Sequence, residues 1–368
     1  MKTTLLIIRW IVGLLFIFSG LIKANDPLGL SYKMQEFFEV WGWTSLHDYT
    51  LMMSMVMNVF EVVAGVAVII GWQMRLFSWL LLLLILFFTF LTGYALFSGK
   101  IKTCGCFGDC LPLTPAQSFG KDIFLLVLIL VLFITRKKIH ASIKPRVAIL
   151  LLLLVTAGTT YGQFYVLKHL PFVDCLPYKA GNNIIEQMKT PEGAVPDSFS
   201  IVFKYEKDGK PLEFDQSSFP ADFDSTYKFI DRHDKLVKKG NGLQAKIVDF
   251  SLQTTDGLDT TQELLGYPNP YILVMAKDME TTEIWRRGFE RIQQAAAQKK
   301  IPVFLVTADA GKAQTLFPEA TILTCDATVM KTAARVVPTY LLMQKAMIID
   351  KIGYLEEPRI MQRINSLK

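Results

Sequence analysis

The stretch CGCFGDC, Cys104–Cys110, lies in a short loop between two apolar runs, Phe77–Phe97 and Phe119–Thr135. Three of the five cysteines in the 368-residue chain fall within these seven positions, and a fourth, Cys175, follows a later apolar run. Each run approaches the roughly 20 residues that an α-helix needs to cross about 30 Å of hydrocarbon. The sequence therefore predicts membrane-spanning helices joined by a cysteine-rich loop.

The composition divides the chain into two parts. Hydrophobic residues make up 51% and charged residues 20%, and the mean hydropathy is positive. The long apolar runs lie within residues 1–168, whereas residues 169–368 have the composition of a water-soluble α/β domain. Much of the net charge of +6 comes from the short run between Arg136 and Arg146. Such a run is typical of membrane orientation and does not by itself indicate nucleic-acid binding.

The apolar runs predict five spans, which are Leu5–Ile22, Leu51–Trp72, Phe77–Phe97, Phe119–Thr135 and Val147–Leu167. A cleaved signal peptide is the competing interpretation of the first run. No small-residue cleavage site follows that run, and further spans come later. Arg9 lies near the start of the first span, where its side chain is expected to extend to the cytoplasmic headgroups.

The positive charges of the short loops predict the orientation. Arg75 lies between the second and third spans, and the run from Arg136 to Arg146 lies between the fourth and fifth. Loops rich in Lys and Arg stay in the cytoplasm, so the N-terminus is expected inside. Residues 23–50, the CGCFGDC loop and everything after residue 168 are then outside, where disulfides form and persist. The expected location is the inner (cytoplasmic) membrane.

Polar features accompany the first two spans. Asn25-Asp26-Pro27 is a typical helix start. The apolar stripe that follows predicts an amphipathic helix on the membrane surface, and its members are Leu30, Met34, Phe37, Phe38 and Trp41. Asn58 and Glu61 lie near the middle of the second span. A carboxylate at that depth is either a structural hydrogen-bonding group or a proton- or quinone-site residue, and both interpretations stay open.

The cysteines can support thiol–disulfide chemistry. Cys104 and Cys106 can close a small strained ring because Gly105 supplies backbone freedom, and strained, exposed disulfides are the labile ones. Cys110 could attack that bridge or pair with Cys175, and the sequence does not choose among the three pairings of four cysteines. A static disulfide across the loop and a structural zinc site are the competing interpretations, although no histidine lies at ligand spacing.

Charged residues flank the cysteine motif. Lys100, Lys102 and Lys121 are expected to favour the thiolate over the thiol. Asp109 and Asp122 oppose that effect or could take part in proton transfer. For Asp122, pairing with Lys121 or Lys102 at the membrane surface is the preferred interpretation. Asp122 and Glu61 are nevertheless kept among the candidate site residues.

Residues 4–136 resemble a known group of membrane proteins. The four-span arrangement, FSGLIKANDPLG (18–29) at the end of span one, the carboxylate in NVFEVVAGV (58–66) and CGCFG after span three are similar to the DoxX/MauE superfamily, in particular its methylamine utilisation protein MauE branch. MauE-type proteins are associated with disulfide formation in extracytoplasmic partners, and DoxX-type proteins with redox stress. Vitamin K epoxide reductase-like enzymes are an analogue that implies a quinone, but this chain lacks their C-x-x-C on a span.

Residues 169–245 are expected to form an extracytoplasmic linker with a β-hairpin. SIVFKYEK (200–207) and KPLEFD (210–215) flank Asp208-Gly209, the favoured two-residue type I′ turn. Cys175 precedes this hairpin and could reach the CGCFGDC loop on the same face. Ser217–Gly242 is predicted as short helices with a loop.

Residues 246–368 alternate between strands and helices. Strands are expected over Tyr271–Met275 and Ile301–Thr307, followed by a hairpin of Thr339–Gln344 and Ala346–Asp350. Expected helices are Glu283–Ala297, with an apolar side of Ile284, Phe289 and Ile292, then Asp326–Arg335 and Pro358–Leu367. This order requires a mixed sheet with helices on both faces.

The same residues resemble a thioredoxin-like domain through DFSLQTTDG (249–257), PYILVMA (270–276) and VVPTYLLMQKAMIID (336–350). Val337-Pro338 matches the cis-proline of that family. Where the family has C-x-x-C, this chain has Met279 and Thr282, so the domain is expected to be inactive as a thioredoxin and to serve for docking. Cys325 is expected to be a small buried hydrophobe, with a substrate-shuttling thiol as the alternative.

The predicted fold is therefore an all-α membrane bundle followed by an α/β domain. Its parts are a four-helix region (1–136), a basic loop with a fifth span (137–168), a linker (169–245) and a degenerate thioredoxin-like domain (246–368). Motifs of nucleotide binding and hydrolysis are absent from the sequence, and His47, His140, His169 and His233 do not cluster.

The predicted function is disulfide exchange or relay at the extracytoplasmic face. Cys104 and Cys106 would exchange, Cys110 and Cys175 would be resolving or structural partners, and Glu61 would be a proton site. The expected partners are membrane lipid and an extracytoplasmic protein client or redox partner; the sequence identifies no cofactor with certainty, and a quinone is compatible with it. The alternative is a non-enzymatic scaffold that recruits an envelope partner, with the cysteines as structural disulfides.

Overall fold

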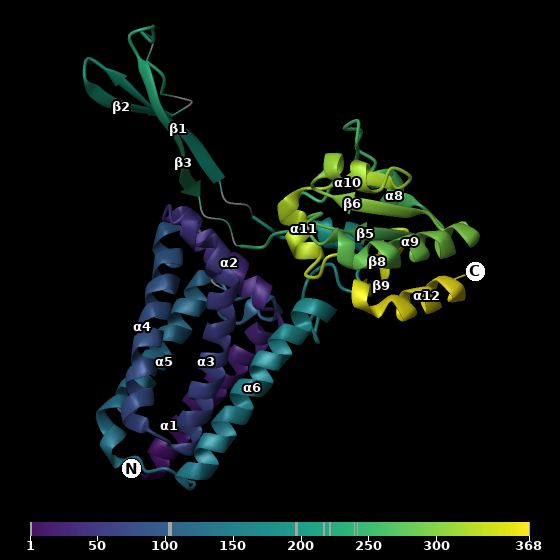
Figure 1. The fold of residues 1–368 in the computed structure, drawn as a ribbon. Coiled ribbons are helices and arrows are strands. Elements are labelled where there is room, and N and C mark those ends of the chain that lie inside the picture. Colours follow the sequence, from purple (N-terminus) through teal and green to yellow (C-terminus); the bar gives the residue numbers. More distant parts are fainter. Residues whose placement is uncertain are drawn as a thin grey trace. The chain divides into compact units, whose positions relative to one another are not determined.

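A computed structural model describes residues 2–101, 105–195, 198–215, 218–220, 222–238, 240 and 242–367. Its helices and strands are labelled in Figure 1. Contacts between Cα atoms divide the chain into two compact units. One comprises Met1–Asn183 with Asp249–Lys368, and the other is Ile184–Val248.

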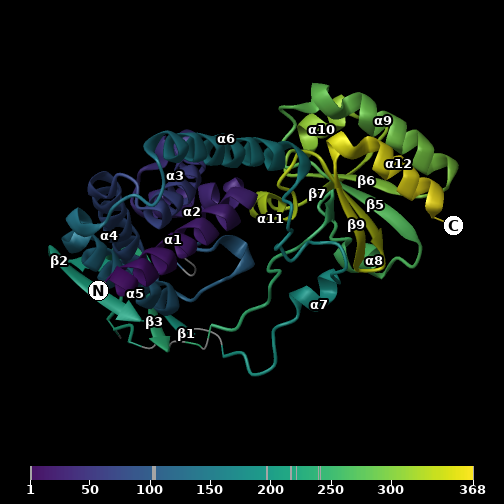
Figure 2. The same ribbon diagram turned by 90° about the horizontal axis from the view of Figure 1, so that it is seen from below.

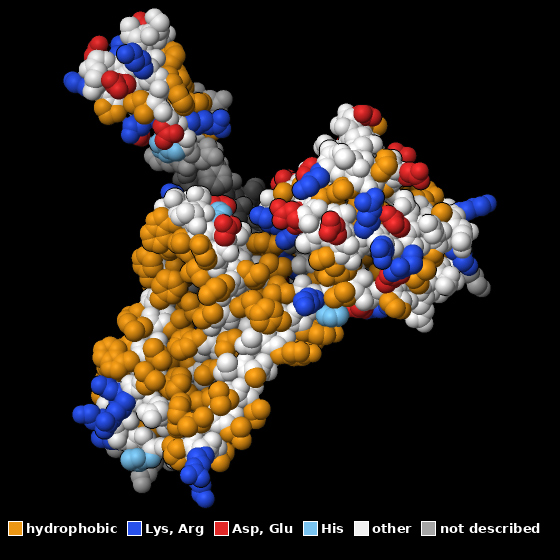
Figure 3. All heavy atoms as spheres, viewed as in Figure 1, with side chains coloured by type: hydrophobic (Ala, Val, Ile, Leu, Met, Phe, Trp, Pro, Cys, Tyr) orange, Lys and Arg blue, Asp and Glu red, His pale blue; other side chains and the backbone are white. Residues whose placement is uncertain are grey.

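Within the described residues, five helices are long and apolar enough to cross a membrane. They are α1 (Lys2–Asn25), α3 (Thr50–Ile70), α4 (Met74–Ser98), α5 (Pro115–Thr135) and α6 (Pro145–His169). Each predicted span falls on one of them. Their outward side chains are apolar, as Figure 3 shows in orange, and Leu14, Leu83 and Leu153 are each more than 50% exposed. So much exposed apolar surface is unfavourable in water but not in lipid. This is therefore a multi-pass membrane protein.

Helices α1 and α3 approach closely because glycines line their contact. A Cβ added to Gly13 would lie 2.7 Å from the Gly65 carbonyl oxygen, and one added to Gly20 would lie 2.9 Å from the Asn58 carbonyl oxygen. Small residues at such positions are typical of helix pairs in membranes. The close approach brings the side chains near the end of α1 against the middle of α3.

Arg9 does not extend to headgroups, so that prediction was wrong. Its side chain is 7% exposed. Nε donates to the Val68 carbonyl (2.9 Å) and Nη2 to the Ile69 carbonyl (2.5 Å). These carbonyls lie in the last turn of α3, where intrahelical donors are missing and a cation is favoured. The last turn of α3 therefore provides the acceptors for the Arg9 side chain.

The polar segment after α1 forms the predicted helix, α2 (Pro27–Val40), followed by the 3₁₀ helix η1 (Thr44–Tyr49). Asp26 caps α2 by accepting from the Gly29 amide (3.1 Å). Part of the predicted apolar stripe is buried, since Phe37 and Phe38 are at most 8% exposed. Phe37 packs with Ala95 of α4 and with Ile101, just before the cysteine loop.

Helix α6 joins the bundle through a polar contact. The Asn58 amide on α3 donates to Gln163 Oε1 (3.0 Å), and Gln163 Nε2 donates to the Met55 carbonyl (3.2 Å). Both side chains are fully buried. The Asn58 side chain is thus a structural hydrogen-bonding group between helices.

The unit Ile184–Val248 contains helix α7 (Ile184–Met188) and, among its described residues, a three-stranded antiparallel sheet of order β2-β1-β3. Strands β1 (Ser198–Lys207) and β2 (Lys210–Asp215) are the predicted hairpin. Asp208 and Gly209 both have positive φ, as the type I′ turn requires.

The prediction of short helices over Ser217–Gly242 was wrong. Residues Lys228–Lys238 form strand β3, which pairs with the free edge of β1. Tyr205 of β1 contacts the rings of Phe214, Phe219, Phe223, Tyr227 and Phe229. This aromatic cluster stabilises the pairing of the strands. Its members are distant in sequence, so the local pattern does not predict the pairing.

Residues after Asp249 form an α/β domain. In its described residues a six-stranded sheet has the order β4-β7-β6-β5-β8-β9. The strands are β4 (Gln253–Thr254), β5 (Pro270–Met275), β6 (Val303–Thr307), β7 (Thr321–Thr324), β8 (Thr339–Gln344) and β9 (Met347–Gly353). Strands β5, β6 and β7 are parallel and the others antiparallel, so the predicted mixed sheet is confirmed. Strand β7 is not among the strands predicted by range, although Cys325, which directly follows it, was expected at the end of a strand.

The helices of this domain are α8 (Thr261–Gly266), α9 (Thr282–Gln298), α10 (Ala310–Leu316), α11 (Ala327–Ala333) and α12 (Glu357–Ser366). Helices α9 and α12 lie side by side (Figures 1 and 2) and share one apolar core with α10 and β5. The predicted apolar side of α9 was wrong at Ile284, which is 67% exposed; Trp285, 2% exposed, takes that place. The Val337–Pro338 peptide is cis, as expected.

Candidate functional site

The cysteine loop, residues 105–114 between α4 and α5, carries the site. Gly105 and Gly108 have positive φ, and the Gly108 amide donates to the Gly105 carbonyl (3.0 Å). A short 3₁₀ helix, η2 (Gly108–Cys110), follows. Thr114 then caps α5 in a capping box with Gln117. Cys104 and Lys102, both named from the sequence, lie outside the described residues.

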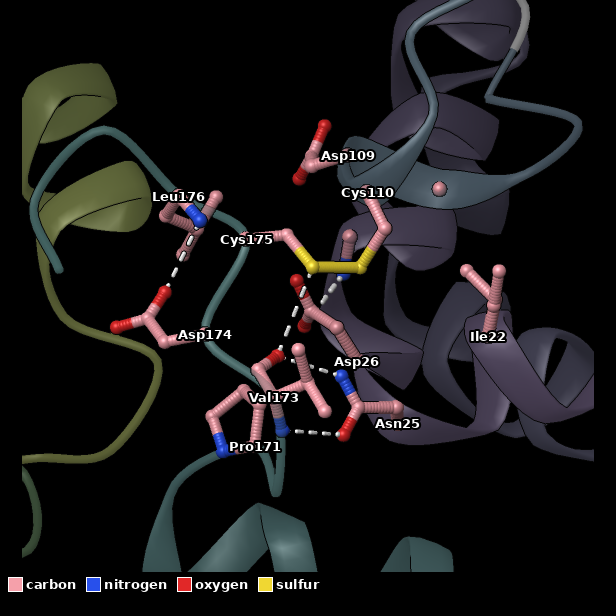
Figure 4. A pocket seen from close by; sticks show the side chains of 12 residues that line it. Ile22, Asn25, Asp26, Asp109, Cys110, Pro171, Val173, Asp174, Cys175 and Leu176 are labelled. Carbon is pink, nitrogen blue, oxygen red and sulfur yellow. Dashed lines mark hydrogen bonds between the residues drawn. A yellow bond between two sulfur atoms is a disulfide. The ribbon is translucent and has the colours of Figure 1, made fainter.

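A disulfide joins Cys110 of this loop to Cys175, 65 residues later. Figure 4 shows it beside the junction of α1 and α2. Asn25 Nδ2 donates to the Val173 carbonyl (2.8 Å), and the Val173 amide donates back to Asn25 Oδ1 (3.1 Å). These two hydrogen bonds hold the segment that precedes Cys175 against the end of α1.

Cys106 is a free, half-buried thiol. Its carbonyl accepts a hydrogen bond from the Ser19 hydroxyl (3.1 Å), which ties the loop to α1 inside the bundle. A pocket of about 40 Å³ lies beside it and is lined also by Ser118 and Leu113. That volume exceeds what one water molecule needs.

Two buried ion pairs lie in the helices near Cys106. Lys23 of α1 pairs with Glu61 of α3, and Glu61 Oε2 accepts from the Ser19 hydroxyl (2.8 Å). Lys121 pairs with Asp122 (2.5 Å), whose other oxygen accepts from Thr92 (3.0 Å). Glu61 and Asp122 are 0% exposed and Lys23 is 3% exposed. We call these two ion pairs, Lys23–Glu61 and Lys121–Asp122, the charge cluster.

Burial, more than the charge cluster, favours the thiol form of Cys106. A thiolate would add one uncompensated negative charge to a poorly solvated site. Burial raises the pKa of the Cys106 thiol, Lys121 and Lys23 lower it and Asp122 raises it, with a net shift upward. The expectation that a flanking lysine favours the thiolate holds for Lys121, whose charge lowers this pKa, but burial outweighs that effect. Lys100 is exposed, and its charge is not among those that shift this pKa.

Two buried cations of the α/β domain, Arg335 and Lys351, bind aspartates beside the disulfide. Arg335 donates to Asp26 (2.8 and 3.0 Å) and to Asp109 (3.0 Å), the residue before Cys110. Lys351 donates to Asp174 (2.8 Å), the residue before Cys175. Burial raises the pKa of Asp109, with Arg335 acting in the opposite direction.

The remaining candidates lie apart from this site. Cys325 follows β7 and is 6% exposed; burial raises its pKa to about 12. This is the environment of a small hydrophobe. No group of three His, Cys, Asp or Glu side chains within the described ranges could hold a metal ion. Since Cys110 and Cys175 are bonded to each other, neither offers a thiolate to zinc.

Sequence reasoning missed several residues that complete the site. Ser19, Lys23, Arg335 and Lys351 were not named as candidates. A lysine and a serine within FSGLIKAN, near the end of an apolar span, could have suggested Lys23 and Ser19, since intramembrane charges usually have partners. Arg335 and Lys351 gave no local signal, because each meets its aspartate only in the folded chain.

Two parts of the chain match protein-family models. Residues 199–239 match a domain of unknown function, DUF8463. Searches of curated proteins and of solved structures gave no match. Residues 1–135 match the family model of methylamine utilisation protein MauE, so this part of the chain is MauE-like.

Proposed function

We propose that this protein carries out thiol–disulfide exchange at the extracytoplasmic face of the inner membrane, with an extracytoplasmic protein as its partner. Cys104 and Cys106 form the exchanging pair, and the Cys110–Cys175 disulfide fixes the loop that carries them. The observation that carries the proposal is a free thiol, Cys106, in the same loop as a disulfide and close to a buried charge cluster.

The buried charge cluster supports a role in proton transfer. Membrane-buried acids and bases are costly and usually serve function. When the Cys106 thiol ionises, its proton moves to Asp122 or Glu61, and the net charge of the buried region is unchanged. Ser19 links Glu61 to the Cys106 backbone through its hydroxyl. Lys121 and Lys23 then hold the thiolate by their charge.

Transfer of one disulfide from the protein to a client needs no cofactor, because bonds and electrons balance between the two. A client thiolate attacks the Cys104–Cys106 disulfide, forms a mixed disulfide and releases a Cys106 thiolate, which takes back a proton. The second client thiol resolves the mixed disulfide, so the client is oxidised by two electrons and the pair is reduced. A membrane quinone fits the return of the pair to the disulfide, since the cysteine loop adjoins the spans.

Charge distribution supports the orientation. The described basic loop residues Arg75 and Arg136–Lys138 lie at the end of the bundle where α1 begins, and the cysteine loop lies at the other end. Basic loops are retained in the cytoplasm, so the cysteines face outward, where disulfides persist. The α/β domain is then on the same side, and its mixed sheet, in which β5, β6 and β7 are parallel, supports a thioredoxin-like docking domain without C-x-x-C.

Thiol trapping at graded redox potential tests this proposal. Purified protein is equilibrated with reductant and oxidant, alkylated, and each cysteine is quantified by mass spectrometry. We expect Cys104 and Cys106 to titrate between about −120 and −270 mV, and Cys110–Cys175 to resist until about −300 mV. In a single-turnover assay, Cys106→Ser should abolish oxidation of a reduced dithiol peptide, and Cys325→Ser should leave it unchanged. If both disulfides resist to about −300 mV, the exchange is refuted and a scaffold remains.

A further inference from the structure

Two buried cations of the α/β domain bind the residues that precede Cys110 and Cys175. Each cysteine directly follows an aspartate, and each aspartate is bound by a buried cation. Asp109 accepts from Arg335 (3.0 Å) and Asp174 from Lys351 (2.8 Å). The cation side chains are 5% and 3% exposed. Buried cations without good partners are strongly unfavourable, so these contacts constrain the backbone on both sides of the disulfide.

Arg335 connects three separate parts of the chain. Its guanidinium binds both oxygens of Asp26, the N-cap of α2, together with Asp109 of the cysteine loop and the Lys331 carbonyl of α11. It also lies 5.3 Å from the centre of the Tyr32 ring on α2. The planar fork of arginine suits such bridging, which a lysine ammonium cannot reproduce in full.

Gly108 and Asp109 lie between the free thiol, Cys106, and the bonded Cys110 along the chain. The pocket beside Cys106 is lined by both residues, and so is the pocket beside Cys110 and Cys175. Figure 4 shows Asp109 immediately above the bonded sulfurs. Gly108 has a φ of +57°, a backbone conformation that glycine adopts with little strain. We call Gly108 and Asp109 the partition. Arg335 holds the Asp109 side chain of the partition by a hydrogen bond (3.0 Å).

We infer that Arg335 is a positioning residue that keeps Cys106 from attacking the Cys110–Cys175 disulfide. By holding Asp109, it fixes the partition and leaves Cys106 available to other partners. This inference deepens the proposed function, because an exchanging thiol beside a disulfide of its own chain needs protection from internal exchange.

The reaction that Arg335 suppresses is balanced within the chain. The Cys106 thiol loses its proton and its sulfur attacks Cys110. A Cys106–Cys110 disulfide forms, the Cys110–Cys175 bond breaks, and Cys175 leaves as a thiolate that takes up the proton. No external oxidant is needed, since one disulfide replaces another.

The test maps disulfides in the full-length protein with Cys104→Ser, which leaves Cys106 as the free thiol of the cysteine loop. Arg335→Gln, Arg335→Lys and a control, Arg359→Gln, are made in this background. Arg359 belongs to the same domain and binds Asp350 and Glu356 while 49% exposed. Native protein is alkylated without reductant, denatured, alkylated with a second reagent, and digested for mass spectrometry. The Cys104→Ser background removes exchange with clients, so the outcome is independent of the proposed function.

With Arg335→Gln, the fraction carrying Cys106–Cys110 and a free Cys175 should rise about tenfold or more, as expected for loss of a charged hydrogen bond. Arg335→Lys should give a smaller rise, and Arg359→Gln none. An unchanged map in both Arg335 variants would overturn the inference. It would also be overturned if Cys325 became reactive in the native state while Cys110–Cys175 stayed intact, since Arg335 would then only stabilise the domain.

Discussion

The membrane bundle buries charged pairs in its interior, whereas the buried cations Arg335 and Lys351 of the α/β domain pair with Asp26, Asp109 and Asp174, which lie outside that domain. In the bundle, Glu61, Lys23 and Asp122 are buried, and large apolar side chains lie outside. In the α/β domain, the shared core of α9, α10, α12 and β5 is apolar. Ion pairs such as Arg286–Glu290 lie on its surface, with both side chains 47% exposed.

The difference is one of environment, between charges screened by water and charges buried among helices. Surface ion pairs contribute little to stability because water screens them. Buried pairs carry a desolvation penalty and are weak evidence for stability. Stability alone therefore does not account for the charge cluster near Cys106, and this supports our proposal that it serves the thiol beside it.

The largest expected effect is a loss of stability on replacing Glu61, which tests the comparison between buried and surface charges. Replacing Glu61 with alanine leaves the Lys23 ammonium buried without its partner, and we expect a loss of about 3–5 kcal/mol of unfolding free energy. The midpoint of thermal unfolding in detergent, followed by circular dichroism, measures this loss. Glu290→Ala is the matched control and should change stability by less than about 0.5 kcal/mol. Equal effects of the two substitutions would contradict the distinction between buried and surface charges.

A smaller effect sharpens the comparison at the two free thiols. With Cys104 replaced by serine, the alkylation rate of Cys106 should keep rising above the pH at which an ordinary cysteine reaches its plateau, because the Cys106 pKa is raised. Lys121→Gln removes a charge that lowers this pKa. The rate at a fixed pH of about 8 should then fall about three- to tenfold, since less thiolate is present.

Two controls accompany this measurement. Lys100→Gln removes an exposed lysine and should leave the Cys106 rate unchanged. Cys325, with its pKa near 12, should react at least about tenfold more slowly than Cys106 under native conditions. A Cys106 rate that ignores Lys121 would show that the charge cluster does not act on the thiol.

The smallest effect concerns the neutral polar pair between α3 and α6. Gln163→Leu leaves the Asn58 amide without its partner and should cost about 1 kcal/mol of unfolding free energy. The double variant Asn58→Leu/Gln163→Leu should cost less than the single one, because both polar groups are then removed. Thermal unfolding in detergent measures both. A double variant less stable than Gln163→Leu would mean that packing, not hydrogen bonding, dominates this contact.

Features with a local signal were predicted well. The five spans follow from the length of their apolar runs, and each falls on a helix. The hairpin at Asp208-Gly209 follows from turn chemistry, and the start of α2 from Asp26-Pro27. Errors arose where a partner was distant in sequence. Arg9 meets the end of α3, and residues 228–238 form a strand because β1 offers them an edge.

The sequence by itself determined the membrane spans, the loop that gathers three cysteines and the alternation of strands and helices after residue 246. Each of these is encoded by residues that are neighbours along the chain. Only the tertiary structure decided that Cys110 bonds Cys175, that Lys23 meets Glu61, and that Arg335 holds Asp26 and Asp109. The reason is that the energy of a buried charge or a disulfide depends on a partner brought close by folding, and no local pattern specifies that partner.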